Sequence, residues 1–285
     1  MSLIELALSK LRNPGASQVS TPRRAVLDAP ASKAAEEPQF LVTPQMRDHL
    51  GIGDAGVFEH QRAAEFRHIK RQIVAEIQAN PASRVVVVAS AMSGEGKSFT
   101  AANLANSLSL EHDYNVVLVD ADAVKPYLTR SLQMTDRPGL MDALANPSLD
   151  VESMIVRTDL NGLRVLPAGS ASAQATEYFA SGRMRQVLDR LLEVPNRIVL
   201  IDALPLLLTT EARALMPLAH QVLVVVRAET TPQAAVKEAL GLIGPGRKVK
   251  LVLNAVVRTK LSRYLGYSYG FEYNYSSSDK KRDTK

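Results

Sequence analysis

The sequence predicts an α/β domain with a doubly wound, mostly parallel sheet over about residues 84–257. Short β-branched runs recur along this segment, and unbroken apolar runs are typical of strands buried on both faces. Amphipathic helical patterns lie between the runs, which favours parallel strands joined by crossover helices. Polar motifs follow three of the runs, at the strand ends where such sheets bind ligands.

The expected elements alternate along the chain. The runs expected to form strands are Val85 to Ala89, Val116 to Val119, Leu163 to Pro167, Ile198 to Ile201, Val222 to Val226 and Lys250 to Leu253. The helical patterns between them are Lys97 to Leu110, Leu140 to Ala145, Gly182 to Leu192, Thr210 to Ala219 and Pro232 to Leu242.

The residues before the sheet are expected to form a helical extension. Residues 1–12 read as a short amphipathic helix, and residues 13–57, which begin with a stretch rich in Pro, Ala and Ser, read as a flexible linker. An apolar stripe that includes Phe66, Ile73 and Ile77 predicts a helix from about Gly56 to Gln78. This helix is assigned to a nucleotide-binding domain over 58–257, and residues 258–285 are expected to form a flexible tail.

The composition is that of a soluble globular protein, with 46% hydrophobic and 22% charged residues among 285. No apolar run approaches the roughly 20 residues that span a bilayer, and the N-terminus does not read as a signal peptide. The absence of cysteine excludes disulfides and thiolate metal sites. The net charge of +5 is spread out, without interleaved aromatic residues, so no nucleic-acid partner is expected. We therefore expect a cytoplasmic protein.

A phosphate-binding loop is expected directly after the first strand. That strand runs into Ser90-Ala91-Met92-Ser93-Gly94-Glu95-Gly96-Lys97-Ser98, and a helical pattern follows. The two glycines let backbone N–H groups turn toward phosphate oxygens, and the start of the helix adds its positive dipole end. Lys97 is expected to reach the outer phosphates, and Ser98 to offer a hydroxyl to Mg²⁺. ATP and Mg²⁺ are therefore the expected cofactors, although Ala91 stands where the strict pattern has glycine.

Three aspartates are expected at the same edge of the sheet as this loop. Asp120 and Asp122 follow the second strand, and Asp202 follows the strand Ile198 to Ile201. Carboxylates there can hold Mg²⁺, directly or through water, and one can accept a proton from an attacking hydroxyl. The alternative is that one of them caps the next helix or turn. The residues expected to be catalytic are Lys97, Asp120, Asp122 and Asp202, and those expected near the metal are Ser98, Asp120 and Asp202.

Over roughly residues 58–275, the chain resembles the bacterial tyrosine kinases, P-loop autokinases that accompany exopolysaccharide export. The matching motifs are Gly94-Glu95-Gly96-Lys97-Ser98, Val119-Asp120-Ala121-Asp122 followed by Lys125-Pro126, Leu166-Pro167-Ala168-Gly169, Ile201-Asp202 and a tyrosine-rich tail. The start Met1-Ser2-Leu3-Ile4-Glu5 is similar to that of the stand-alone autokinases linked to exosortase-type polysaccharide loci.

The resemblance implies transfer of the γ-phosphate of ATP to tyrosines of the protein's own tail, on a neighbouring subunit of a ring. It implies a homo-oligomer that a membrane polysaccharide co-polymerase, or chain-length determinant protein, recruits to the inner face of the membrane. Asn254 is similar to an asparagine that lies near the adenine in the family. The residues expected to contact the nucleotide are Ser93, Gly94, Glu95, Gly96, Lys97, Ser98, Phe99 and Asn254.

The C-terminal segment carries a tyrosine cluster in a chain with only eight tyrosines. Together with the resemblance, this clustering predicts phosphoacceptors, and each phosphotyrosine would add about −1.5 to −2 charges. The alternatives are a sticky tail or a final β-hairpin. The predicted acceptors are Tyr264, Tyr267, Tyr269, Tyr273 and Tyr275.

Departures from the family pattern leave other functions open. Ala203-Leu204-Pro205 and Glu211-Ala212 replace family residues after the third aspartate, and Ala64 replaces the glutamate of a ring-forming motif that Arg67 and Lys70 match. One alternative is a partitioning or septum-site type of ATPase switch, although Met92 stands where that group has a signature lysine. Another is a non-catalytic nucleotide-binding regulator of an export complex.

Overall fold

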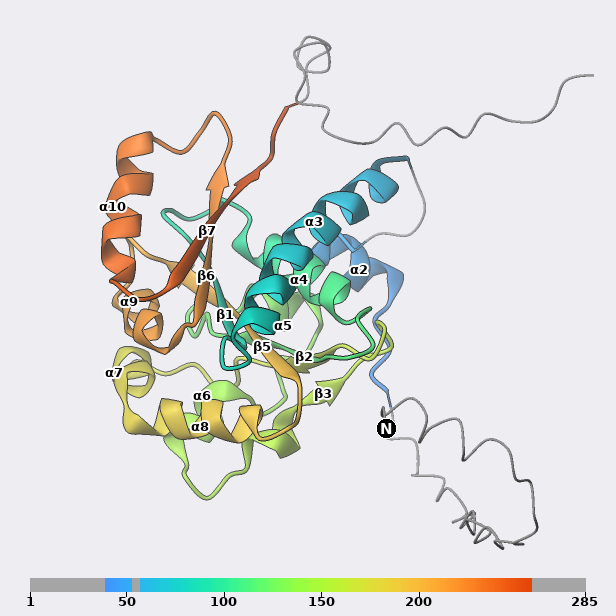
Figure 1. The fold of residues 1–285 in the computed structure, drawn as a ribbon. Coiled ribbons are helices and arrows are strands. Elements are labelled where there is room, and N and C mark those ends of the chain that lie inside the picture. Colours follow the sequence, from blue (N-terminus) through green and yellow to red (C-terminus); the bar gives the residue numbers. More distant parts are fainter. Residues whose placement is uncertain (1–38, 53–56, 258–285) are drawn as a thin grey trace, which may run out of the picture. The chain divides into compact units, whose positions relative to one another are not determined.

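A seven-stranded sheet forms the centre of residues 39–52 and 57–257, the part of the chain that the computed structural model describes (Figure 1). Its order is β3-β4-β2-β5-β1-β6-β7, and neighbouring strands pair in parallel except β3 with β4. The strands are β1 (Val85–Ser90), β2 (Asn115–Asp120), β3 (Val156–Arg157), β4 (Arg164–Leu166), β5 (Arg197–Pro205), β6 (Gln221–Arg227) and β7 (Lys248–Asn254).

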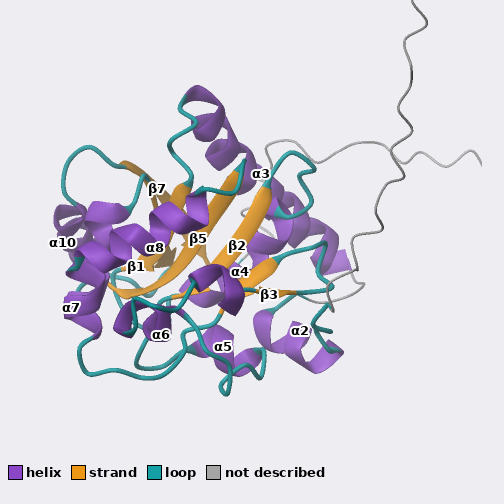
Figure 2. Cartoon of the chain, turned by 90° about the horizontal axis from the view of Figure 1, so that it is seen from below, coloured by secondary structure: helices purple, strands orange, loops and turns teal. Residues whose placement is uncertain are grey.

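Helices cover both faces of the sheet (Figure 2). They are α2 (Pro44–Leu50), α3 (Val57–Ala79), α4 (Lys97–Leu108), α5 (Tyr127–Ser131), α6 (Leu140–Ala145), α7 (Ala175–Ala180), α8 (Gly182–Leu192), α9 (Thr210–Leu215) and α10 (Gln233–Ile243). Short 3₁₀ helices occupy Val151–Met154 and Met216–Leu218. None of the described helices is both long enough and apolar enough to cross a membrane.

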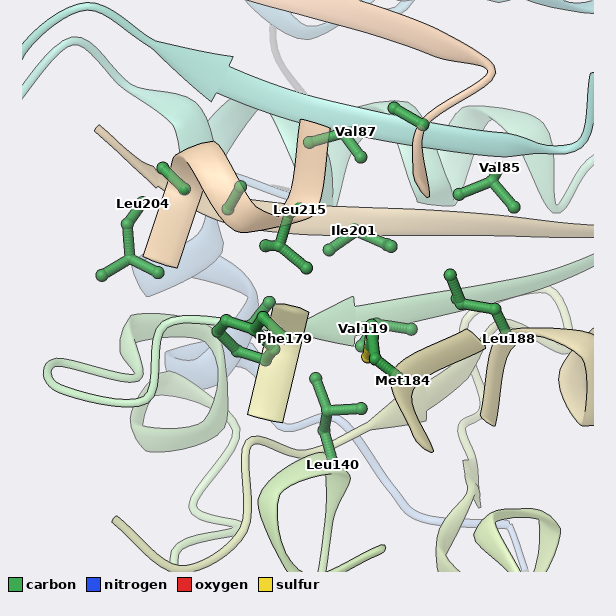
Figure 3. Packing of buried hydrophobic residues seen from close by; sticks show 14 of the residues in the cluster. Val85, Val87, Val119, Leu140, Phe179, Met184, Leu188, Ile201, Leu204 and Leu215 are labelled. Atoms are coloured by element: carbon green, nitrogen blue, oxygen red, sulfur yellow. The ribbon is translucent and has the colours of Figure 1, made fainter. Parts of the chain in front are cut away.

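Alternation along each strand builds two hydrophobic cores, one on each face of the sheet. In β1, Val85 and Val87 point to the core that α6 to α10 close, whereas Val86 and Val88 point to the core that α2 to α5 close. Figure 3 shows the first of these cores, where Phe179 of α7 packs near the strand residues Val119 and Ile201. Strand β1 is buried on both faces, and this explains why the sequence has an unbroken apolar run there.

The predicted architecture is confirmed. Each of the expected strands and helices between Arg84 and Asn254 is present, with ends that move by a few residues. The pattern Thr210 to Ala219 divides into α9 and a 3₁₀ turn, because Pro217 cannot continue the α-helical hydrogen bonds. The sequence analysis missed β3, α5 and α7, which are too short for their periodicity to stand out.

The prediction of a flexible linker over 13–57 is wrong for residues 40–52. Helix α2 lies there, with the Thr43 hydroxyl accepting from the Met46 N–H at its start and Gly51 ending it at φ 65°. Met46 and Leu50 are buried in the core on the α3 and α4 side. A cap, a proline in the first turn and a terminal glycine marked this helix, but its seven residues carry too few apolar positions for a periodic signal. The parts of the prediction on residues 1–38, 53–56 and 258–285 lie outside the described residues.

Leu50→Ala tests whether α2 belongs to the folded domain. Leu50 is 2% exposed, so truncation should lower the free energy of unfolding by about 2–5 kcal/mol through lost burial and a residual cavity. Urea unfolding followed by circular dichroism measures the loss. Leu41→Ala is the matched control, because Leu41 is 68% exposed and should cost less than about 0.5 kcal/mol. Equal effects of the two substitutions would contradict the placement of α2 in the core.

Candidate functional site

The loop between β1 and α4 has the backbone of a phosphate cradle. Gly94 and Gly96 adopt φ values of 80° and 91°, in the left-handed region that glycine tolerates best. A Cβ on Gly96 would lie 2.0 Å from the Asn254 amide nitrogen, so a larger residue there would have to displace this side chain. No side chain caps the N-terminus of α4, which leaves the N–H groups of its first turn directed at the loop. The cradle therefore offers backbone donors to an anion.

Side chains from the β6–β7 edge of the sheet hold this loop in place. The Glu95 carboxylate is buried, accepts from the Met92 N–H at 2.7 Å and accepts from the Thr231 hydroxyl. The Asn254 amide donates to the Glu95 carbonyl at 2.9 Å, and the Arg227 guanidinium donates to the Gly94 carbonyl at 3.1 Å. Glu95 and Asn254, expected at the nucleotide, thus use these groups to brace the loop itself.

Sequence reasoning missed Thr231 and Arg227. Both lie at the carboxyl end of β6 or just beyond it, and neither belongs to a motif with recognisable spacing. Their position near the end of a buried strand predicts that they lie at the edge of the sheet, but it does not predict a contact with the loop.

The register of β2 and β5 brings two acids together. Asp120 ends β2 and is the direct neighbour of Asp202 in this parallel pair, whereas β5 itself continues past Asp202 to Pro205. Both side chains are buried. The sequence prediction that these strand ends meet is therefore confirmed by the pairing.

Hydrogen bonds fix the Asp120 carboxylate. One oxygen accepts from the N–H and the hydroxyl of Thr129, each at 2.8 Å, and the other accepts from the Asp122 N–H at 3.1 Å. The Thr129 hydroxyl in turn accepts from the Ala168 N–H at 2.9 Å. Asp120 therefore connects the end of β2 to α5 and to the loop after β4, so part of its role is structural.

Asp122 shapes the next turn with one oxygen. Its Oδ1 accepts from the N–H groups of Val124 at 3.1 Å and Lys125 at 2.7 Å. The side chain is half-buried, and these bonds leave Oδ2 for another partner. Turn formation and a chemical role are therefore compatible for this residue.

Among the acids of the site, Asp202 has the carboxyl whose ionisation is the least favourable. Burial, followed by the nearby charge of Asp120, raises the pKa of its carboxyl to about 8, against the lowering effects of a hydrogen bond from Ser98 and the charge of Lys97. Burial also raises the pKa of Asp120 to about 6, although its bonds to Thr129 lower it. Asp202 Oδ1 is buried and has no hydrogen-bond partner. Such an oxygen is the position that a cation would stabilise.

The residues present fit a magnesium ion in part. The hydroxyl of Ser98 and the free oxygen of Asp202 are hard oxygen ligands at the mouth of the loop. Within the described ranges no group of three or more histidine and carboxylate side chains gathers to bind a metal alone. An ion held there would need oxygen atoms of a bound phosphate or water to complete its shell.

Other predicted site residues are placed differently. The Phe99 ring lies 6.1 Å from the Phe66 ring and closely approaches Gly51, so its side chain packs in the core and only its backbone faces the loop. Ser93 is exposed and Lys97 half-buried, as contact with a ligand requires. The five predicted acceptor tyrosines lie outside the described residues.

The residues after Asp202 that differ from the family pattern are accommodated in the fold. Strand β5 continues to Pro205 and is buried along its whole length. The N–H groups of Leu206 and Leu207 donate to the carbonyls of Ser90 and Ala91, at 2.8 and 3.2 Å. The apolar residues here therefore support the start of the phosphate loop.

The fold and the site together define a P-loop α/β domain. The model of the family described as "AAA domain" matches residues 83–252. The tyrosine-protein kinase YwqD of Bacillus subtilis is 28% identical over 208 residues, which are 72% of this chain and 81% of that protein. The succinoglycan biosynthesis transport protein ExoP of Rhizobium meliloti is 31% identical over 206 residues, 70% of this chain but only 26% of its own length.

Solved structures agree. The crystal structure of the VpsO kinase domain superposes with a TM-score of 0.60 at 25% identity, covering 71% of this chain and 100% of that domain. The chain belongs to this AAA-domain family, and its relatives include bacterial tyrosine-protein kinases, as the sequence motifs indicated.

The raised pKa of Asp202 predicts a dependence of stability on pH. Its folded pKa of about 8 lies above the model value of 3.8, so the folded protein binds the proton more tightly and stability falls as pH rises from about 4 to 8. Asp202→Asn removes this charge and should make the protein more stable than wild type at pH 8, by on the order of a few kcal/mol. The advantage should shrink at pH 5. Thermal unfolding in EDTA at both pH values measures it.

The control for this experiment is Asp136→Asn, which changes an exposed aspartate. It should shift the melting temperature little at either pH. If Asp202→Asn changed stability equally at pH 5 and pH 8, the buried charge would not be the cause.

Proposed function

We propose that this protein is an ATP-dependent protein-tyrosine kinase that phosphorylates tyrosines of its own C-terminal segment. The observation that carries the proposal is the shared sheet edge of a phosphate loop and the buried acids Asp120 and Asp202, in a chain whose relatives include bacterial tyrosine-protein kinases. The proposed acceptors are Tyr264, Tyr267, Tyr269, Tyr273 and Tyr275.

ATP and Mg²⁺ are the proposed cofactors. The N–H groups of the loop and of the first turn of α4 would bind phosphate oxygens, and Lys97 would add its positive charge at the outer phosphates. Ser98 and Asp202 would hold the metal, which when bound offsets the charge that develops on the phosphates. A bound cation would also relieve the cost of ionising Asp202 in its buried position.

Asp120 ends β2 and Asp122 follows it. The hydrogen bonds of these two acids favour Asp122 as the one that contacts the tyrosine hydroxyl. Asp120 is fully buried and both of its oxygens accept hydrogen bonds within the fold. Asp122 is half-buried and keeps an oxygen that is not used in the turn. In this proposal Asp122 orients or deprotonates the hydroxyl, while Asp120 positions the end of β2.

The proposed setting is an oligomer that serves exopolysaccharide synthesis and export. One relative is a succinoglycan biosynthesis transport protein, which supports a membrane polysaccharide co-polymerase as the partner that recruits this chain. If the subunits assemble into a ring, Arg67 of α3 would be available for contacts between subunits and Lys70 would not. Lys70 is buried and lies 2.6 Å from Glu111 in an ion pair within the chain.

Lys97→Met should abolish tyrosine phosphorylation, because the outer phosphates lose their compensating charge. With Mg²⁺ and ATP, wild type should gain phosphate between Tyr264 and Tyr275, and the variant should gain at least about 100-fold less. Asp122→Asn should slow the transfer by about 10²–10⁴-fold without weakening nucleotide binding. Phosphopeptide mass spectrometry over a time course measures both, and isothermal titration with an ATP analogue measures the binding.

Lys237→Met is the matched control, since Lys237 lies exposed on α10. It should phosphorylate as wild type does. Release of inorganic phosphate without phosphotyrosine would instead show an ATPase switch, and binding of nucleotide with neither activity would show a non-catalytic regulator. Either outcome would overturn the proposed function.

A further inference from the structure

Strand β7 leaves an apolar face and an edge uncovered. It is the last strand of the sheet beside β6, and no other strand in the described ranges pairs with its outer edge (Figure 1). Val249, Leu251 and Leu253 are 40%, 56% and 61% exposed, and their spacing of two places them on one face of the strand. Natural proteins rarely leave a long apolar edge open, because it pairs with other strands. We therefore expect another strand to pair with this edge.

The sequence offers one in the segment that follows. Residues 267–275 read Tyr-Ser-Tyr-Gly-Phe-Glu-Tyr-Asn-Tyr, with an aromatic side chain at each second position and small or polar residues between. Alternation of this kind is typical of a strand with one apolar face, and it matches the period of the open face of β7. Aromatic residues opposite β-branched and leucine residues are favourable cross-strand pairs.

We propose that residues 267–275 of the same chain dock on the outer edge of β7 as an added antiparallel strand. Their aromatic side chains would cover Val249, Leu251 and Leu253, and their backbone would satisfy the open edge.

The length of chain permits this return. Strand β7 ends at Asn254, so residues 255–266 connect it to the docking segment. At roughly 3.3 Å per residue this connection reaches farther than the approximately 23 Å that β7 itself spans, so the segment can reverse direction and lie along the whole edge.

Charge also fits this arrangement. The face of β7 opposite the apolar row carries Lys248, which lies 3.6 Å from the Glu76 carboxylate, and Lys250, which donates to the Gln221 side chain at 3.0 Å. In the docked segment, Glu272 lies in the set of residues that alternates with the aromatic ones, so it would share this basic face. The alternation of the segment thus places its aromatic residues toward the apolar row and Glu272 toward the lysines.

The docked segment contains four of the tyrosines that the proposed function names as acceptors. If that function holds, docking would keep these tyrosines on β7 in the unphosphorylated protein. Phosphates carrying about −1.5 to −2 charges each would then oppose burial against apolar side chains and release the segment. This consequence rests on the proposed function, whereas the docking itself does not.

Hydrogen–deuterium exchange of the full chain tests the docking. The Lys97→Met background keeps the tail free of phosphate, so the result does not depend on kinase activity. We expect amides of 267–275 and of β7 to be protected, and Leu251→Glu or Phe271→Asp to speed exchange in both segments by about tenfold or more. Amides of β1 should be unchanged.

Two controls make the test specific. Leu110→Glu changes a leucine that is 53% exposed, close to the 56% of Leu251, but far from β7 in sequence and outside the strands. Leu261→Asp changes an apolar residue of the tail outside the docking segment. Both should leave protection intact.

Protection of 267–275 that survives Leu251→Glu, or exchange of 267–275 at the rate of an open chain, would overturn the proposal. Protection that rises with protein concentration would assign the docked strand to a second copy and would overturn the intrachain form proposed here.

Discussion

The parallel register of β2 and β5 is the constraint on which the site depends. It fixes Asp120 beside Asp202 at the sheet edge where the phosphate loop leaves β1. Burial, followed by the nearby charge of Asp120, makes ionisation of Asp202 costly and raises the pKa of its carboxyl to about 8. The fold thus places an acid that ionises unfavourably at the position where a cation would be held. An acid suited to hold a cation at this position thus lowers the stability of the fold when it ionises.

The phosphate loop is held from the opposite side of β1. Glu95, Thr231 and Asn254 connect it to the ends of β6 and β7, while Ser98 and Asp202 connect α4 to β5. The loop is therefore fixed between the two halves of the sheet. Asn254, at the end of β7, is the residue of this strand that contacts the phosphate loop.

Much of this could be predicted from the sequence, for physical reasons. Strands buried on both faces are unbroken apolar runs, and a loop that must turn its N–H groups inward needs glycine at fixed positions. The helix α2 was missed because its stability comes from packing of Met46 and Leu50, not from a local pattern. The bracing role of Glu95 was missed because its partner Thr231 is distant in sequence. The structural bonds of Asp120 to Thr129 could not be foreseen, since α5 was not predicted.

Asp202 should stay protonated near neutral pH until a cation offsets the charge of its carboxylate. A ¹³C NMR titration of aspartate carboxyl groups in the metal-free protein measures this protonation, with Asp202→Asn assigning the signal. We expect a resonance that titrates near pH 8 and is lost in the variant, and a second resonance for Asp120 near pH 6. If both carboxyls titrated near pH 4, like exposed aspartates, the buried acid pair would not have the electrostatics described here.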